Sequence, residues 1–230
     1  MKVFILAAGR GIRLRPLTDT LPKPLLTAGG KPLIVWHLER LAACGFKDIV
    51  INHAHLGQMI EAALGDGRRF GLVIRYSPEP PGALETAGGI ARALPLLGDE
   101  PFLVVNGDIS CDWDFSRARA LAGRDAHLVL VDNPREHADG DFCLAGETVR
   151  YASSNLGPTL TYAGIGVFSP RFFAAVPSGA VMKMRPLLDA AIAQGVVTGE
   201  HHQGQWVDVG TPERLAELDQ ELSTHVSPHP

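Results

Sequence analysis

The chain has 230 residues, a formal net charge of −4 and 46% hydrophobic residues, which is typical of a globular protein with a sizeable core. This acidic balance gives no indication of a nucleic-acid or membrane partner, and we expect neither. Three widely spaced cysteines, Cys44, Cys111 and Cys143, form no metal pattern and no disulfide framework. They favour a reducing compartment, and we expect a cytoplasmic protein.

The first expected element is a short buried strand over residues 3–6, because its apolar run has no helical spacing. A loop of small and basic residues follows, with Gly9, Gly11, three arginines and then Lys23 between two prolines. Small residues let a backbone approach a ligand, and successive backbone N–H groups can hold an anion. The loop therefore indicates a site for a triphosphate at the end of this strand.

Strands and helices then alternate along the chain. A turn is expected at residues 27–32. Further strands are expected at residues 48–52, 72–76, 102–106 and 127–131. Helices are expected at residues 33–44, 56–64, 86–94, 115–122, 185–194 and 211–222. This alternation predicts an α/β fold with a doubly wound, mostly parallel, Rossmann-like sheet in a three-layer αβα arrangement.

The pattern changes over residues 133–168, where short alternating segments separated by glycines predict a small antiparallel excursion that covers the sheet edge. Residues 196–202 and 205–209 are expected to form a final pair of strands. The last helix has Thr211 as its expected N-cap and Pro212 at its first position. We expect a single domain over residues 1–222 and a disordered tail over residues 223–230.

Two aspartates are candidates for metal chemistry. Asp108 directly follows the strand at 102–106, and ligands bind beyond the carboxyl ends of strands in open parallel sheets. Asp208 lies among apolar residues, where an unpaired charge is costly to bury and needs a cation or hydrogen bonds. Alternatively, Asp108 caps the next segment as a turn residue, and Asp208 hydrogen-bonds the backbone before the helix at Thr211.

Other nucleotide-binding patterns are excluded. The dinucleotide fingerprint needs a third glycine where this chain has Leu14, and the Gly-Lys-Ser/Thr of a P-loop is absent. The histidine pairs His53/His55 and His201/His202 have no cysteine or acidic residue at matching spacing. Strand and loop positions are therefore favoured for them over metal ligation.

The N-terminal loop carries one long combined pattern. It reads Leu6-Ala7-Ala8-Gly9-x-Gly11-x-Arg13-x-Arg15-Pro16-Leu17-Thr18, followed by Pro22-Lys23-Pro24-Leu25. This pattern resembles the signature of the sugar-1-phosphate nucleotidyltransferases, and the resemblance extends over nearly the whole chain. It implies that the small-residue turn holds the nucleotide and that Arg15 and Lys23 act as catalytic, phosphate-contacting residues. Arg10 and Arg13 are left open between phosphate contacts and solvated side chains.

The same resemblance implies further roles. Asp108 and Asp208 would bind Mg²⁺, which usually takes one or two protein carboxylates and fills its remaining positions with phosphates and water. The segment 78–89 would contact the base, although Thr86 stands where many relatives carry glutamine. The implied nucleotide-binding residues are Leu6, Ala7, Ala8, Gly9, Gly11, Pro78, Glu85, Thr86, Gly88 and Gly107. For the sugar, the candidates are Asn106, Asp141 and Gly164, each of which could equally be structural.

Several further segments resemble one subgroup of this family. They are residues 51–54, 75–79, 105–109, 130–134 and 206–211. The subgroup transfers UMP from UTP to N-acetylmuramate 1-phosphate in cell-wall recycling and releases pyrophosphate. The lactyl carboxylate of that sugar would need a cation, and Lys31, Arg150 and Lys183 remain open as candidates. The acceptor phosphate is largely ionised at neutral pH, since its second pKa is ~6, so in-line attack needs no general base.

Two alternatives remain. The chain could be a mannose- or glucose-1-phosphate nucleotidyltransferase, or a catalytically silent, nucleotide-binding regulatory subunit. A silent subunit would be expected to have lost Lys23, Asp108 or Asp208, and all three are present. We expect a monomer or a weak homo-oligomer.

Overall fold

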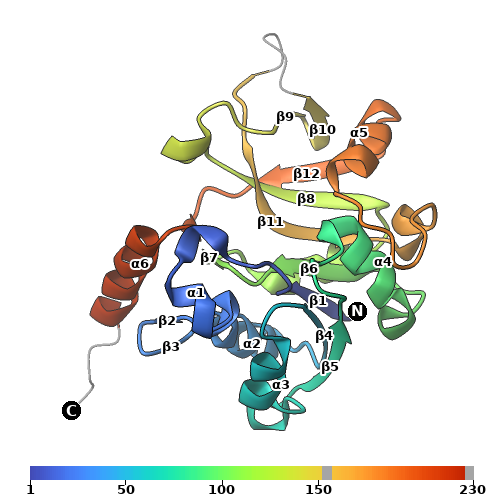
Figure 1. Ribbon diagram of the computed structural model, residues 1–230. Helices are drawn as coiled ribbons and strands as arrows, with labels where there is room; N and C mark the ends of the chain where they lie inside the picture. The colour runs from blue at the N-terminus through green and yellow to red at the C-terminus, as the bar shows by residue number, and fades with distance from the viewer. Residues whose placement is uncertain (152–156, 226–230) are drawn as a thin grey trace.

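The structure, a computed structural model, describes residues 1–151 and 157–225 (Figure 1). Its main feature is a nine-stranded sheet in the order β5-β4-β1-β6-β11-β8-β12-β10-β9. Two small two-stranded sheets, β13-β7 and β2-β3, accompany it. Helices cover both faces of the main sheet, which confirms the predicted three-layer α/β architecture with its mostly parallel, Rossmann-like sheet.

The bounds of the elements are as follows. The main sheet contains β1 (Val3–Leu6), β4 (Asp48–His53), β5 (Val73–Pro78), β6 (Phe102–Asn106), β8 (Ala126–Val131), β9 (Phe142–Ala145), β10 (Thr148–Tyr151), β11 (Thr161–Phe168) and β12 (Val197–His201). The small sheets contain β2 (Thr27–Ala28), β3 (Lys31–Pro32), β7 (Ile109–Cys111) and β13 (Trp206–Asp208). The helices are α1 (Leu17–Thr20), α2 (Leu33–Ala43), α3 (Gly57–Leu64), α4 (Glu85–Leu97), α5 (Arg185–Ala193) and α6 (Pro212–His225). Short 3₁₀ helices are η1 (Ile12–Leu14), η2 (Lys23–Leu25), η3 (Arg68–Phe70), η4 (Phe115–Leu121), η5 (Arg135–His137) and η6 (Pro170–Phe173).

Strands β5, β4, β1 and β6 form the parallel half of the sheet. Strand β1 lies between β4 and β6, and it is buried on both faces. Val3 and Ile5 enter the core on the α2 side of the sheet, whereas Phe4 enters the core on the α4 side. Burial on both faces accounts for the continuous apolar sequence of this strand.

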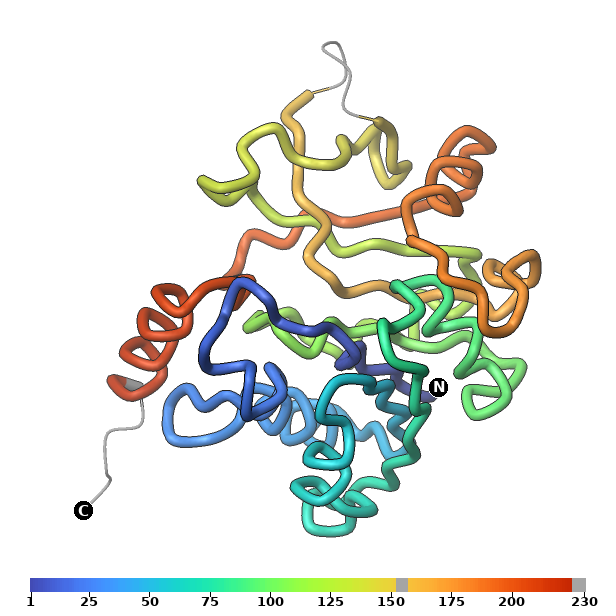
Figure 2. The backbone as a smooth tube through the Cα atoms, viewed as in Figure 1, coloured from blue at the N-terminus to red at the C-terminus, as the bar shows by residue number. Residues whose placement is uncertain are grey.

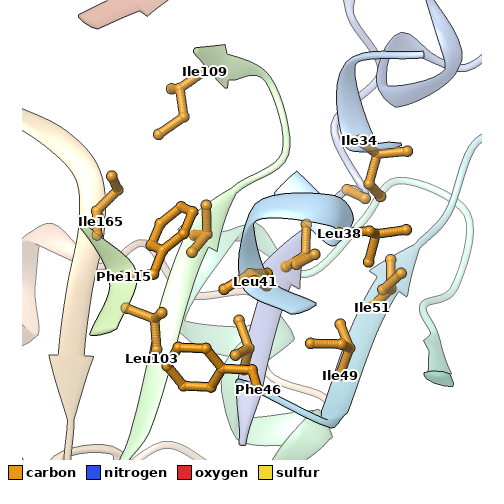
Figure 3. Packing of buried hydrophobic residues seen from close by; sticks show 14 of the residues in the cluster. Ile34, Leu38, Leu41, Phe46, Ile49, Ile51, Leu103, Ile109, Phe115 and Ile165 are labelled. Atoms are coloured by element: carbon orange, nitrogen blue, oxygen red, sulfur yellow. The ribbon is translucent and has the colours of Figure 1, made fainter. Parts of the chain in front are cut away.

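The core on one face is formed mainly by α2 and the strands beneath it. Figure 3 shows Leu38 of α2 beside Ile51 of β4, and Ile34 and Leu41 of α2 belong to the same cluster, as does Leu103 of β6. The spacing of three and four residues places these α2 side chains on one side of the helix, which therefore packs onto the sheet. On the opposite face, the buried side chains of α4 and α5 form a second core cluster.

The antiparallel segment differs in part from the prediction. Strands β9 and β10 do pair antiparallel at the sheet edge. Strand β11, however, does not cover an edge, because it runs antiparallel between β6 and β8 in the middle of the sheet. Its residues Ala163, Ile165 and Val167 face the core on the α2 side, whereas Phe168 belongs to the core on the opposite face, as expected for a strand covered on both faces.

The two strands expected as a final pair lie in different sheets. Strand β12 joins the main sheet in parallel with β8, whereas β13 pairs antiparallel with β7. A side-chain pattern predicts where a strand lies in the sequence, but it does not specify which partner the strand finds. The consequence is important for function, because β7 begins just after β6 and therefore brings β13 to the ligand edge of the sheet.

Some element ends also differ from the prediction. Residues 115–121 form a 3₁₀ helix, and α4 extends beyond its expected end to Leu97. The predicted N-cap of α6 is confirmed, since the Arg214 N–H donates to Thr211 Oγ1 over 3.4 Å. This helix continues to His225, so the first residues of the expected tail are helical. Residues 226–230 of that tail lie outside the described residues, and the single domain over residues 1–222 stays a prediction.

A third apolar cluster joins the N-terminal loop to α6. Leu14 and Leu26 pack with Val209 and Leu218, and the Gly29 N–H donates to the carboxylate of Asp219 over 2.8 Å. In Figure 2, the loop that follows β1 accordingly runs beside the segment that leads into α6. Within residues 1–151 and 157–225, no helix has the length and apolar character needed to cross a membrane.

Candidate active site

A buried hydrogen-bond chain fixes the loop after β1. Asn52, near the end of β4 and only 1% exposed, accepts a hydrogen bond from the Ala7 N–H over 2.7 Å. Its amide group donates to Glu79 over 2.6 Å, and Glu79 in turn accepts from the Leu84 N–H over 2.7 Å. These bonds link the small-residue turn to the loop before α4, so both loops are held in place around the space between them.

That space is a cavity of about 340 Å³, which we call the donor cavity. Its lining includes several predicted nucleotide-binding residues together with Asn52 near the end of β4, Asn106 at the end of β6 and Asp108 just after β6. The lining residues are Leu6, Ala8, Gly9, Arg10, Asn52, Glu79, Gly82, Ala83, Glu85, Thr86, Asn106 and Asp108. Its position beyond the carboxyl ends of β1, β4 and β6 is the expected ligand edge of a parallel sheet.

Other predicted nucleotide-binding residues serve the packing around this cavity. The Gly107 N–H donates to the carbonyl of Leu6 over 2.9 Å, and a Cβ there would lie 2.8 Å from that oxygen. At Gly88, a Cβ would lie 2.0 Å from the carbonyl oxygen of Ala180. Gly11 has a positive φ of 68°, which glycine adopts without strain. Pro78 offers its carbonyl to Arg92 over 2.7 Å.

The two predicted metal ligands line one common cavity. Strand β13 pairs with β7 so that Asp208 is opposite Ile109, and the Val209 N–H donates to the carbonyl of Asp108 over 2.9 Å. Backbone pairing thus brings together two carboxylates that are far apart in the sequence. Both side chains line a second cavity of about 480 Å³, which we call the acceptor cavity.

The acceptor cavity joins the donor cavity at two residues. Its lining consists of Arg13, Asn106, Asp108, Ile109, Pro134, Glu136, His137, Thr161, Tyr162, Ala163, Gly164, Trp206 and Asp208. Asn106 and Asp108 line both cavities. A group held at Asp108 would therefore contact molecules on both sides, which is the arrangement that a transfer between two bound substrates requires.

Lys23 approaches Asp108 closely. Its ammonium nitrogen lies 2.5 Å from Asp108 Oδ2, and the lysine is 8% exposed. The 3₁₀ helix η2 begins at Lys23, and the prolines on either side restrict the backbone from which this side chain extends. The structure therefore brings together a predicted phosphate-contacting residue and a predicted metal ligand.

Of the three arginines in this loop, Arg10 and Arg13 line a cavity, whereas Arg15, for which a catalytic role was predicted, does not. Arg15 pairs with Asp19 over 3.0 Å, its side chain is half exposed, and it is not among the described residues that line either cavity. Arg13 lines the acceptor cavity with its guanidinium 3.7 Å from Asp208 Oδ2. Arg10 lines the donor cavity and donates to the Thr18 carbonyl over 2.7 Å. The catalytic role of Arg15 stays a prediction.

The sugar-side candidates lie near one another. Gly164 has a φ of 75°, and a Cβ there would lie 2.6 Å from the amide nitrogen of Asn106. Asp141 accepts from the Tyr162 N–H over 2.9 Å and lies 3.1 Å from His137, so it supports the wall of the acceptor cavity.

Tyr162 itself lines the acceptor cavity. Burial raises the pKa of its hydroxyl well above the usual value, which keeps the side chain neutral.

The three cations considered for a lactyl carboxylate are not among the described residues that line the acceptor cavity. Lys31 pairs with Glu39 over 2.6 Å instead. The sequence did not single out Asn52, Glu79 or Trp206 as site residues and left Arg13 open, and the structure places all four at the cavities. Asn52 and Glu79 could have been found, because each lies near the carboxyl end of an expected parallel strand, like Asp108.

The residues present fit a divalent cation. Asp108 and Asp208 offer hard oxygen donors in one cavity, and cationic side chains already approach both carboxylates: Lys23 at Asp108, and Arg13 and Arg214 at Asp208. This attraction for positive charge is the property that a magnesium site needs, with phosphates and water as the remaining ligands.

Comparisons with known proteins show the family to which the chain is similar. A family model described as nucleotidyl transferase matches residues 2–142. The N-acetylmuramate alpha-1-phosphate uridylyltransferase of Neisseria meningitidis serogroup B is 54% identical over 222 residues, which cover 94% of this chain and 96% of that protein. The protein of the same name from Caulobacter vibrioides is 34% identical over 229 residues, covering 91% and 92%.

More distant relatives have other substrates in their names. A mannose-1-phosphate guanylyltransferase of Mycobacterium tuberculosis is 30% identical over 98% of this chain and 66% of its own length. A crystal structure from Bacillus anthracis, described as a glucose-1-phosphate thymidylyltransferase in complex with a sucrose, superposes with a TM-score of 0.84 at 22% identity. It covers 100% of this chain and 98% of that chain, and so shares the fold.

Proposed function

Because this chain belongs to the nucleotidyl transferase family, we propose that it transfers UMP from UTP to N-acetylmuramate 1-phosphate. The products are UDP-N-acetylmuramate and pyrophosphate. The observation that carries the proposal is the position of Asp108, which lines both the donor and the acceptor cavity with Lys23 against it. The 54% identity to a uridylyltransferase over nearly the whole chain favours UTP and this acceptor over the alternatives.

On the donor side, the turn after β1 and the loop before α4 hold the nucleotide. The hydrogen bonds from Ala7 to Asn52 and from Asn52 to Glu79 fix the two loops before the substrate arrives. Glu85 and Thr86 line the same cavity at the start of α4, where they are available to the base. A pre-formed cavity lowers the entropy that must be lost when the nucleotide is positioned.

Asp108 and Asp208 would hold Mg²⁺, which when bound supplies positive charge to the phosphoryl groups. With the metal held there, the Lys23 ammonium group would be available to a phosphate oxygen, since it lies at the junction of the two cavities. Arg13, which lines the acceptor cavity, provides further positive charge near the reacting groups. Arg15 would have to leave its ion pair with Asp19 to contact a phosphate.

The acceptor phosphate supplies the nucleophile. Its oxygen attacks the α-phosphorus in line, the bond between the α-phosphorus and the bridging oxygen breaks, and pyrophosphate leaves. Because the second pKa of a phosphate monoester is ~6, the nucleophile is already ionised at neutral pH and no side chain has to remove a proton. The protein's task is to bring two polyanions together and to stabilise the charge of the transition state.

We also propose that this reaction belongs to cell-wall recycling in the cytoplasm and that the enzyme is a monomer or a weak homo-oligomer. The test of the function is pyrophosphate release measured over a matrix of nucleoside triphosphates and sugar 1-phosphates with Mg²⁺. The highest kcat/KM is expected for UTP with N-acetylmuramate 1-phosphate. Preference for mannose or glucose 1-phosphate would favour the alternative transferase, and UTP binding without turnover would favour a silent regulatory subunit.

A further inference from the structure

We propose that Arg214 is a positioning residue that holds the carboxylate of Asp208 for the metal and the acceptor loop at η5 for the acceptor. This inference rests on the proposed function. It concerns a residue of α6 that is not among the described residues lining either cavity.

Arg214 holds both the backbone and the side chain of Asp208. One guanidinium nitrogen, Nη1, donates to the Asp208 carbonyl over 3.0 Å and lies 3.1 Å from Asp208 Oδ2. The arginine side chain is 17% exposed, so this contact is largely shielded from water. Its place is set by the first turn of α6, where the Arg214 N–H is capped by Thr211.

The other guanidinium nitrogen reaches across to the acceptor loop. Arg214 Nη2 lies 2.5 Å from Glu136 Oε1, and Glu136 lies in η5 and lines the acceptor cavity. Glu136 is about half exposed, and an ion pair of this kind contributes ~1 kcal/mol at most. A contact of that strength can open and close as a substrate enters, which a fully buried pair could not do.

Contacts from Arg214 and Arg13 hold the Asp208 carboxylate in a defined orientation. Arg13 also approaches Oδ2 of this carboxylate, at 3.7 Å, and Gly210 makes room for the group. A Cβ at Gly210 would lie 2.9 Å from Asp208 Oδ2 and 3.0 Å from the Arg13 guanidinium. Both cations therefore engage the same oxygen, so the carboxylate is presented to the cavity in one orientation rather than free to rotate.

Positioning and simple charge predict opposite effects when Arg214 is replaced. Loss of a positive charge beside Asp208 would by itself strengthen the binding of a divalent cation. Loss of orientation would weaken it, because a metal ligand must be held in the productive geometry. The sign of the change in metal affinity therefore separates the two explanations.

The experiment compares Arg214→Gln, Arg214→Lys and Glu136→Gln with the wild-type protein. Mn²⁺ binding to the protein alone is measured by electron paramagnetic resonance, and the Mg²⁺ dependence, acceptor KM and UTP KM are measured by pyrophosphate release. R214Q is expected to weaken Mn²⁺ binding about tenfold and to raise the acceptor KM, with partial recovery of Mn²⁺ binding in R214K. E136Q is expected to raise the acceptor KM about fivefold while Mn²⁺ binding stays unchanged.

Arg124→Gln is the matched control, because it removes an exposed ion pair with Glu147 that lies outside both cavities among the described residues. It should leave all four quantities unchanged. Tighter Mn²⁺ binding in R214Q, or an acceptor KM unaffected by E136Q, would overturn the proposal. Because Mn²⁺ binding is read without substrates, a wild-type protein that transfers no UMP would refute the proposed function while still testing the hold of Arg214 on Asp208.

Discussion

The ammonium group of Lys23 lies 2.5 Å from Asp108 Oδ2, at the junction of the donor and acceptor cavities. The lysine is buried and the aspartate is partly exposed to both cavities. If Asp108 holds a divalent cation, as proposed, that cation would have to compete with Lys23, and the displaced ammonium would lie beside the space proposed for the phosphates. This one ion pair would then connect metal binding with substrate binding.

Replacement of Asp108 by Asn should abolish turnover and leave the fold intact. The amide keeps the shape of the side chain but lacks the negative charge that attracts the metal. We expect a loss of ~100-fold or more in kcat/KM for pyrophosphate release. Mutating a residue that only hydrogen-bonds a metal ligand already lowers metal affinity or activity by about 10- to 100-fold, so loss of a ligand itself should lower activity at least as much. Asp99→Asn, at an exposed position, is the control. Full activity of D108N would remove Asp108 from the metal site.

Replacement of Lys23 by Met should have opposite effects on two quantities. Without the ammonium group, Asp108 is free to bind a cation, so Mn²⁺ binding to the protein alone should strengthen about fivefold, corresponding to ~1 kcal/mol. The UTP KM should rise and kcat should fall, because a phosphate-binding cation is lost. Calorimetric titration measures the Mn²⁺ affinity, and initial-rate kinetics measure the UTP KM and kcat. Weaker Mn²⁺ binding in K23M would contradict competition between Lys23 and the cation for Asp108.

Replacement of Gly164 by Ala should damage acceptor binding through Asn106. The backbone φ of 75° and a Cβ position 2.6 Å from the Asn106 amide nitrogen mean that this side chain must move. Gly146→Ala is a matched control, because Gly146 also has a positive φ, 61°, but a Cβ there meets no atom within 4 Å.

Both glycine variants should lose ~1–2 kcal/mol of unfolding free energy from backbone strain. Only G164A should raise the acceptor KM, by about tenfold, in pyrophosphate-release assays. An equal acceptor KM in the two variants would show that displacement of the Asn106 side chain does not impair acceptor binding.

The stability of the protein should fall as the pH falls below 6.5, partly because of His37. Burial, together with the positive charge of nearby Arg40, lowers the pKa of this imidazole from its usual value of 6.5 to about 4. Between these values the unfolded chain binds the proton and the folded chain does not. Unfolding therefore becomes easier as the pH decreases through this window. Above pH 6.5 both states are neutral and the effect is absent.

At pH 5, the expected contribution of His37 is ~2 kcal/mol relative to pH 7. The difference in unfolding free energy between pH 7 and pH 5, measured by urea unfolding, should be smaller by this amount in His37→Gln than in the wild type. His137→Gln, at an exposed histidine, should keep the wild-type difference. If H37Q also keeps the wild-type difference, His37 does not cause the loss of stability at low pH.

Much of the parallel half of the fold could be predicted from the sequence. The apolar runs of β1, β4 and β6 and the helical spacing of α2 are local signals, and the structure places those elements where they were expected. Partner choice is not a local signal. The central position of β11 and the separation of β12 from β13 depend on which faces remain open after the other elements have packed.

The candidate site was predictable where a strand-end rule or a continuous motif applied, as at Lys23 and Asp108. It was less predictable where distant segments meet. Arg13 and Arg15 are two residues apart in one loop, and only the folded turn decides that Arg13 lines a cavity while Arg15 pairs with Asp19. Likewise, His202 pairs with Asp112 over 2.7 Å, a partner that spacing in the sequence does not suggest.

The pairing of β7 with β13 has a consequence for biosynthesis. The ribosome makes Asp108 long before it makes Asp208, and the nascent chain holds only one of the two carboxylates until Trp206–Asp208 has emerged and found Ile109–Cys111. Translation that stops early therefore yields a protein without the second proposed ligand. If Asp208 is the second ligand, as proposed, nucleotide-sugar synthesis requires translation at least through β13, the last strand among the described residues, because that strand supplies this carboxylate.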